Sequence, residues 1–244
     1  MADILKRSKD RKVANSATPS GAVRIANTFG LPSGSEYSCI GQTSVCGSIC
    51  YAGKLERIYK GVSDVLMHNY ELLLKSSREE MTFLLAEIVA DFVAETVKRG
   101  DPLEFRVHWD GDFFSIDYTN AWSDVIGAHP EVQFWVYTRN PQACALLAEH
   151  AHENLALYFS ADQENWKFAT SLRSAYGTKV RLAVLGQTFE EAKRMYSDEY
   201  SRPVAACPEQ LGRIELITPK GGACITCGLC PRGKADIAFS ISKK

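Results

Sequence analysis

Short apolar segments alternate with segments of helical periodicity along most of this chain, and no other pattern narrows the choice of fold as much. Six segments rich in β-branched and aromatic residues precede Cys207: residues 22–29, 103–108, 132–137, 155–159, 180–185 and 203–206. A seventh, residues 236–241, lies near the C-terminus. Because helical segments separate them, we expect the strands to run parallel and to be buried on both faces.

This alternation predicts an α/β fold, either a doubly wound open sheet or a complete or partial (β/α) barrel. We expect a partial barrel of the (β/α)6 type, similar to part of a TIM barrel, over residues 21–206. Residues 207–244 then form a cysteine-rich segment with the final strand, and the basic residues 1–20 form a flexible tail. In either architecture, catalytic and binding residues belong at the carboxyl ends of the strands.

The composition excludes several classes of protein. The 28 Lys and Arg against 29 Asp and Glu leave a net charge of −1, which disfavours nucleic acid as a main partner. No apolar run approaches the roughly 20 residues of a membrane span, and the basic N-terminus lacks the apolar core of a signal peptide. We therefore expect a cytoplasmic protein with no membrane partner. In that reducing compartment, eight cysteines indicate metal or redox chemistry.

Three cysteines near the C-terminus, Cys224, Cys227 and Cys230, follow one another at a spacing of two intervening residues. Such a loop presents three thiolates from a short stretch of backbone, and each can bind a different iron of a [4Fe–4S] cluster, as in bacterial ferredoxin loops. We predict an iron–sulfur cluster here, with Cys207 as the fourth ligand. A structural zinc site is the alternative, because zinc also binds four thiolates.

A second group, Cys39, Cys46 and Cys50, has no obvious fourth ligand nearby in the sequence. A cubic cluster held by three thiolates leaves one iron open, and an open iron binds a substrate or cofactor. Two alternatives remain: a distant residue such as Cys144 closes the site, or the three thiols are unrelated core residues. We expect Cys144 itself to be a core thiol on an amphipathic helix.

The order of these elements resembles the radical S-adenosylmethionine (SAM) superfamily, whose barrel carries a three-cysteine loop after its first strand. Here Cys46-x3-Cys50-Tyr51-Ala52-Gly53 is similar to the end of that loop, and Asp110-Gly111-Asp112 to the element that receives the methionine amino group. Thr138-Arg139-Asn140 and Ser160-Ala161-Asp162 stand at the ends of the next two strands, where the superfamily also has polar elements. The spacing C-x6-C-x3-C and the single Gly111 depart from the superfamily's pattern.

The resemblance implies that a cluster on Cys39, Cys46 and Cys50 reductively cleaves SAM, with residues after the strands binding its methionine part. Asp112 with Gly111 would bind the methionine ammonium. The carboxylate or ribose would contact Arg139, Ser160 or Asp162, and His108 would face the pocket as a catalytic or substrate contact. Each of these residues also has a structural alternative: Asp112, Ser160 and Asp162 as helix caps, Arg139 in a surface ion pair, and His108 as a hydrogen-bonded core histidine.

A second likeness is to a phage protein family known as "gene product 88"-like. The segments that carry it run from Cys39 to Ala52, from His108 to Phe114, and from Cys207 to Cys230. This likeness implies the host cytoplasm as the location and supplies no reaction.

Two further functions stay open. In the first, the protein is an iron–sulfur redox or sensor protein that needs an electron donor but no SAM. In the second, it is a zinc protein that binds nucleic acid or another partner. The residues do not distinguish a small-molecule substrate from a nucleotide-like one.

Overall fold

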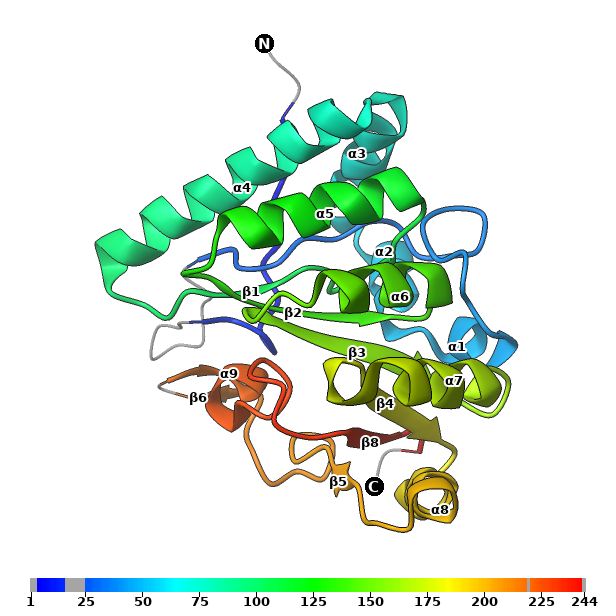
Figure 1. The fold of residues 1–244 in the computed structure, drawn as a ribbon. Helices are drawn as coiled ribbons and strands as arrows, with labels where there is room; N and C mark the ends of the chain where they lie inside the picture. Colours follow the sequence, from blue (N-terminus) through cyan, green and yellow to red (C-terminus); the bar gives the residue numbers. More distant parts are fainter. Residues whose placement is uncertain (1–3, 16–24, 219, 243–244) are drawn as a thin grey trace.

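A six-stranded parallel sheet forms the centre of the computed structural model, which describes residues 4–15, 25–218 and 220–242 (Figure 1). In spatial order its strands are β1 (Glu104–Arg106), β2 (Gln133–Thr138), β3 (Leu155–Ala161), β4 (Arg181–Gly186), β8 (Ile237–Ser240) and β5 (Ala205–Ala206). Every neighbouring pair is parallel. The predicted α/β class with a parallel sheet is therefore confirmed.

One strand differs from its predicted form. The segment predicted as the first strand makes one isolated parallel bridge, from Thr28 to Arg106, while residues 22–24 lie outside the described part of the chain. The final strand β8 lies between β4 and β5. Within the described residues, the strands stand in a linear order and form no closed barrel.

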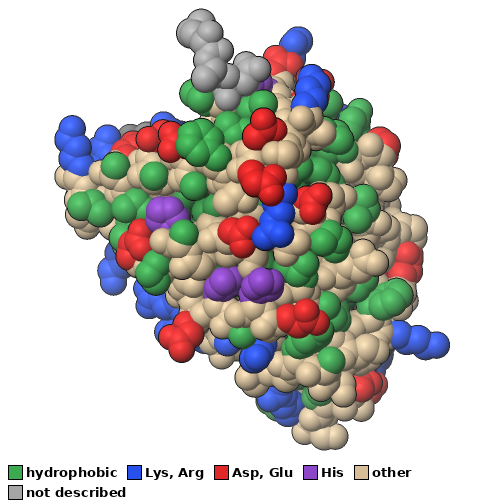
Figure 2. Space-filling view, turned by 45° about the horizontal axis from the view of Figure 1, so that its top comes forward, with side chains coloured by type: hydrophobic (Ala, Val, Ile, Leu, Met, Phe, Trp, Pro, Cys, Tyr) green, Lys and Arg blue, Asp and Glu red, His purple; other side chains and the backbone are tan. Residues whose placement is uncertain are grey.

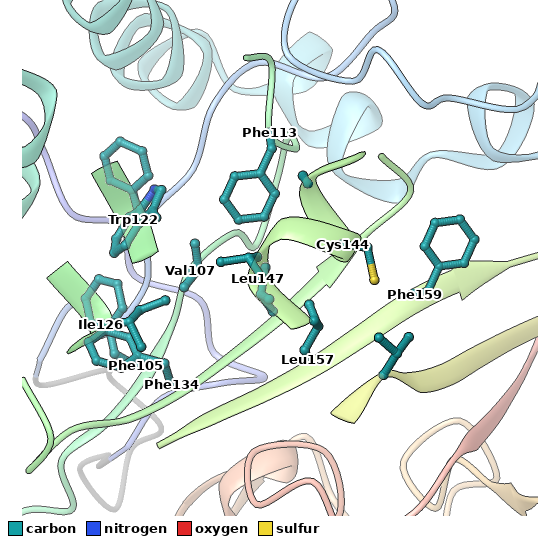
Figure 3. Close-up of a cluster of buried hydrophobic side chains, with 14 of the residues drawn as sticks. Phe105, Val107, Phe113, Trp122, Ile126, Phe134, Cys144, Leu147, Leu157 and Phe159 are labelled. Carbon is teal, nitrogen blue, oxygen red and sulfur yellow. The ribbon is translucent and has the colours of Figure 1, made fainter. Parts of the chain in front are cut away.

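The helices that connect the strands all pack against one face of the sheet (Figure 1). They are α4 (Arg78–Arg99), α5 (Ile116–Ala128), α6 (Pro141–His150), α7 (Trp166–Tyr176) and α8 (Phe189–Tyr200). Side chains alternate between the two faces of a strand, so each strand supplies every second residue to this layer. Figure 3 shows part of the resulting core, including Phe134, Leu157 and Trp122. Cys144 lies in the same core and is completely buried, as predicted.

The remaining elements lie around this layered core. Short helices α1 (Ser44–Ile49) and α2 (Tyr51–Ile58) lie on either side of Cys50, with Cys46 in α1, and lead into α3 (Lys60–Lys75). Tyr59 separates α2 from α3, and a Ser77–Glu80 capping box begins α4. A 3-10 turn, η1 (Gly177–Lys179), precedes β4, and β6 (Ile217–Thr218), β7 (Gly221–Gly222) and α9 (Ala223–Cys227) complete the cysteine-rich segment.

The other face of the sheet is covered by the two ends of the chain instead of by crossover helices. Val13 and Ile225 pack there against Trp135, Tyr158 and Ile237. Residues 4–15 therefore differ from the predicted flexible tail, because Leu5, Val13 and Ala14 are buried; residues 1–3 and 16–20 lie outside the described residues. Backbone hydrogen bonds from Cys224 to Lys12 and from Gly222 to Ala14 join the two ends.

Acidic and basic side chains are interspersed over the face seen in Figure 2. Within the described residues, no helix combines the length and apolar character that a membrane span requires.

Candidate functional site

The first cysteine loop lies across the carboxyl ends of β1, β2 and β3, where the sequence predicts the site. Thr43, the N-cap of α1, donates its hydroxyl to Asp162 Oδ2 at 2.6 Å, and Arg139 Nη1 donates to the same oxygen at 2.6 Å. Asp162 follows β3 and Arg139 follows β2, and both are nearly buried. This arrangement connects the loop to two strand ends through a buried ion pair. Arg139 is therefore not in the surface ion pair that we considered as its alternative.

Asp112 joins the same framework through three hydrogen bonds. Its Oδ1 accepts from the Phe113 N–H and the Thr138 hydroxyl, both at 2.7 Å, and its Oδ2 accepts from the Arg139 N–H at 2.7 Å. Burial raises the pKa of Asp112 to about 6 against the lowering effect of these donors. Both oxygens are thus engaged inside the protein, and the N-cap of the following helix is Ser115 instead.

Gly111 and Ser160 also contribute to the packing of the loops. Gly111 has a φ of +79°, and a Cβ there would lie 2.7 Å from the Leu31 carbonyl oxygen, so the first loop can approach β1 only because this residue is glycine. The Ser160 carbonyl accepts from the Asn165 side chain, and Asn165 is the residue that begins α7. The predicted ligand-binding residues therefore meet at one rim, where the contacts made by Gly111, Asp112, Arg139 and Asp162 position the cysteine loop.

His108 differs from the prediction that it faces a pocket. It is 2% exposed, its Nε2 is 2.8 Å from the Tyr118 hydroxyl, and its ring packs against Phe113. Burial and then the nearby Arg106 charge lower the pKa of His108 to about 3, so the ring is neutral at pH 7. This is the structural alternative considered for His108, a hydrogen-bonded core histidine.

The three thiols of the first group lie half-buried at this rim. Burial, and next the Asp112 carboxylate, raises the pKa of Cys39. Burial has the largest effect on Cys46 and raises its pKa. The Arg139 charge lowers this pKa, and the Cys50 thiol raises it. The Gly53 N–H donates to Cys50 Sγ at 3.3 Å, so Cys50 caps the start of α2. The Arg139 guanidinium thus lies near Cys46, but burial outweighs its effect and the pKa of this thiol stays raised.

Sequence reasoning gave no role to Glu56 and placed Asp110 only within the Asp110-Gly111-Asp112 element. Asp110 is 3% exposed, and its Oδ2 has no hydrogen-bond partner among the described residues. Burial, and next the negative charge of Glu56, raises the pKa of Asp110 to about 8. Asp110 is therefore protonated at neutral pH. The only sequence signal was the position of Asp110 directly after a strand.

We predict that the Asp110→Asn variant loses a pH dependence of stability that the wild type has. The pKa of Asp110 in the folded protein is about 8, above its ordinary value of 3.8. The stability that the proton on Asp110 contributes is therefore complete below pH 3.8 and is lost as pH rises through 8. Between pH 5 and 8 the wild type should therefore lose stability relative to D110N, on the order of 1 kcal/mol per pH unit. Urea unfolding at several pH values measures this, and parallel curves for the two proteins would contradict the assignment.

The second cysteine group lies on the sheet face opposite the crossover helices. Cys207 follows β5, Cys224 and Cys227 belong to α9, and Cys230 follows them. All four line one small cavity whose other walls are mostly apolar: Pro208, Glu209, Ala223, Leu229, Pro231 and Ile237. The predicted grouping of a distant Cys207 with the C-terminal run is therefore seen in the fold.

Side chains from two other parts of the chain hold this second group in place. The Tyr158 hydroxyl of β3 donates to the carbonyl oxygens of Ala235 at 3.0 Å and Leu229 at 3.4 Å. Lys12 pairs with Glu209 at 2.5 Å and places its charge near Cys224 and Cys207. Burial raises the pKa of Cys224 and of Cys230 to about 12, so without a metal these thiols stay protonated at neutral pH.

The four cysteines around this cavity are candidate metal ligands. Across the residues that the structure describes, no three His, Cys, Asp or Glu side chains converge closely enough to hold one metal ion. A zinc ion takes four sulfurs at about 2.3 Å, whereas in a [4Fe–4S] cluster each thiolate binds a different iron.

Comparison with known proteins identifies relatives along nearly the whole chain. The family model described as "Gene product 88" matches residues 3–233. The "Gene 88 protein" of Mycobacterium phage L5 is 46% identical over 245 residues, which cover 98% of this chain and 99% of that protein. The "Gene 88 protein" of Mycobacterium phage D29 is 46% identical over 246 residues, with the same coverage. No solved structure matches this chain.

Proposed function

This chain belongs to the gene product 88 family of phage proteins, and from that premise we propose that it is an iron–sulfur protein. Cys207, Cys224, Cys227 and Cys230 would hold a [4Fe–4S] cluster on the sheet face opposite the crossover helices. The observation that carries this proposal is that four cysteines, one of them distant in sequence from the other three, line a single cavity. Thiolates are the usual ligands of such a cluster, and apolar walls limit its contact with water.

A second cluster on Cys39, Cys46 and Cys50 is the proposed catalytic centre. Three thiolates leave one iron open for SAM, and the loop lies at the carboxyl ends of three parallel strands, where α/β folds place their sites. If bound there, a reduced cluster would supply one electron to the sulfonium of SAM for cleavage of a carbon–sulfur bond. Crossover helices on one face only, as in a segment of a (β/α) barrel, agree with this assignment.

One observation favours a second candidate, an iron–sulfur electron carrier or sensor that does not use SAM. Asp112 and Asp162, two of the residues expected to contact the methionine part, already accept hydrogen bonds from inside the protein on both oxygens. A ligand would have to bind beside them and not in their place. The two candidates share the clusters and differ only in the reaction with SAM.

Anaerobic reconstitution with iron and sulfide, followed by quantitation and electron paramagnetic resonance (EPR) before and after SAM is added, tests the proposal. We expect two clusters, about eight irons per chain, and a signal that SAM changes. With a strong reductant, 5′-deoxyadenosine should accumulate in the wild type and not in a variant carrying Cys46→Ala and Cys50→Ala. Bound iron whose EPR signal does not respond to SAM would support the electron carrier or sensor and refute the SAM enzyme. Zinc in place of iron would refute both candidate functions.

A further inference from the structure

Helix α1, which carries Cys46, is attached to the protein almost without hydrophobic contacts. None of its six residues is buried, and neither Val45 nor Ile49 belongs to a hydrophobic cluster of the described residues. A helix this short is unstable by itself, and burial of apolar side chains is what usually holds such a helix in place. Polar contacts therefore keep α1 at the rim.

Among the described residues, the hydrogen bonds that join α1 to another element all lie at its first turn. The Thr43 hydroxyl, which accepts from the Cys46 N–H at 3.1 Å, donates to Asp162 Oδ2 at 2.6 Å. Next to it, Glu164 accepts from the Ser44 N–H at 2.9 Å and from the Ser44 hydroxyl. These two pairs, Thr43 with Asp162 and Ser44 with Glu164, form a latch.

The two carboxylates of the latch belong to a well-braced turn between β3 and α7. Asp162 is 1% exposed, and its Oδ1 accepts from the Glu164 N–H at 3.0 Å. Its own N–H donates to Asn165 Oδ1 at 2.8 Å, and the nearly buried Arg139 guanidinium pairs with its Oδ2. These contacts do not involve α1, so the carboxylates stay in place when α1 detaches. The moving part of the latch is therefore α1.

The chain is fixed on both sides of α1. Before the helix, Gly41 lies so close to the Arg139 carbonyl oxygen that no room is left for a Cβ. After the helix, the Cys50 thiol caps the start of α2. Detachment of α1 would therefore move Cys46 away from Cys39 and Cys50, while those two thiols keep their positions.

We propose that the latch positions Cys46 in the first cysteine group and that its opening admits and releases the cluster there. This inference rests on the proposed function, and it gives Asp162 a positioning role instead of a contact with SAM. A closed latch brings the three thiols together, whereas an open latch withdraws one of the three ligands. A segment with few buried apolar contacts opens at a lower free energy than the core around it.

Amide hydrogen exchange of the metal-free, full-length protein measures this opening. In the wild type, the amides of α1 should exchange roughly tenfold or more faster than those of β2 and β3. Thr43→Val removes the hydroxyl and leaves the Asp162–Arg139 pair intact, so exchange in α1 should become about tenfold faster still. Thr43→Ser keeps the hydroxyl and should restore the wild-type rate.

Thr188→Val is the matched control. Thr188 caps α8 in the same way, because its hydroxyl accepts from the Glu191 N–H at 3.2 Å. The substitution removes the same kind of cap from a helix that carries no cysteine, and it should leave exchange in α1 unchanged. Exchange in α1 that is as slow as in the sheet, or equal in T43V and wild type, would overturn this inference and leave the proposed function intact.

Iron release to a chelator from the reconstituted protein tests the link to the cluster. T43V should lose the iron of the first group about tenfold faster than the wild type or T43S, with the C-terminal iron released at the wild-type rate. A variant with Cys46→Ala and Cys50→Ala, which keeps only the C-terminal group, identifies that second rate. Equal release from T43V and wild type would overturn this inference alone. A chain that binds no iron would overturn the proposed function and the role of the latch in cluster release.

Discussion

Replacing Cys224 and Cys227 with alanine should remove one of the two proposed iron–sulfur centres, so that the reconstituted protein holds about four fewer irons than the wild type. The two residues line the cavity shared by Cys207 and Cys230, and two remaining thiols cannot hold a four-iron cluster. Because the first cysteine group lies at the strand ends and not in this cavity, its cluster should remain. Iron and sulfide quantitation with absorption spectroscopy measures the loss.

Cys144→Ala is the control for this experiment. It removes a thiol of the same kind from a position in the hydrophobic core, apart from both cysteine groups. Burial raises the pKa of the Cys144 thiol. This variant should keep the full iron content and lose only a modest amount of stability. Equal iron in C144A and the double variant would refute the assignment of the C-terminal ligands.

Asp236→Ala should cost more stability than any substitution at the rim, about 3–5 kcal/mol. Asp236 is 9% exposed and precedes β8 directly. Its Oδ1 accepts from the Leu182 N–H at 2.7 Å and from Arg173, and its Oδ2 accepts from Arg202 and the Tyr196 hydroxyl. Removing the carboxylate leaves the buried end of Arg173 and a buried N–H unpaired. Urea unfolding of the metal-free protein measures the loss.

The same variant connects stability with the second cysteine group. Asp236 holds the start of β8 against β4, and β8 follows the cysteine loop after a short connection. A loosened β8 should therefore also reduce the iron retained by the C-terminal cluster. Asp198→Ala, an exposed aspartate on α8, is the control and should change stability by less than about 0.5 kcal/mol. If D236A unfolds at the same urea concentration as D198A, this account of β8 fails.

Much of the candidate site was predictable because it depends on local pattern. Polar residues directly after apolar strands indicate the rim of a parallel sheet, and Arg139 and Asp162 do meet there. Two intervening residues between successive cysteines indicate a single centre, and those cysteines do share a cavity. The hydrogen-bond partners of each polar side chain were not predictable from the sequence. The donors to Asp112, for example, include residues 26 and 27 positions away.

The sequence by itself determined the kinds of element, their parallel direction, and the residues that stand at the strand ends. Those properties follow from periodicity and turn chemistry within a few residues. Only the tertiary structure decided that β8 enters between β4 and β5 and that residues 4–15 cover the sheet face. These depend on pairings between distant segments, and a periodic pattern records that a residue is buried but not which segment buries it.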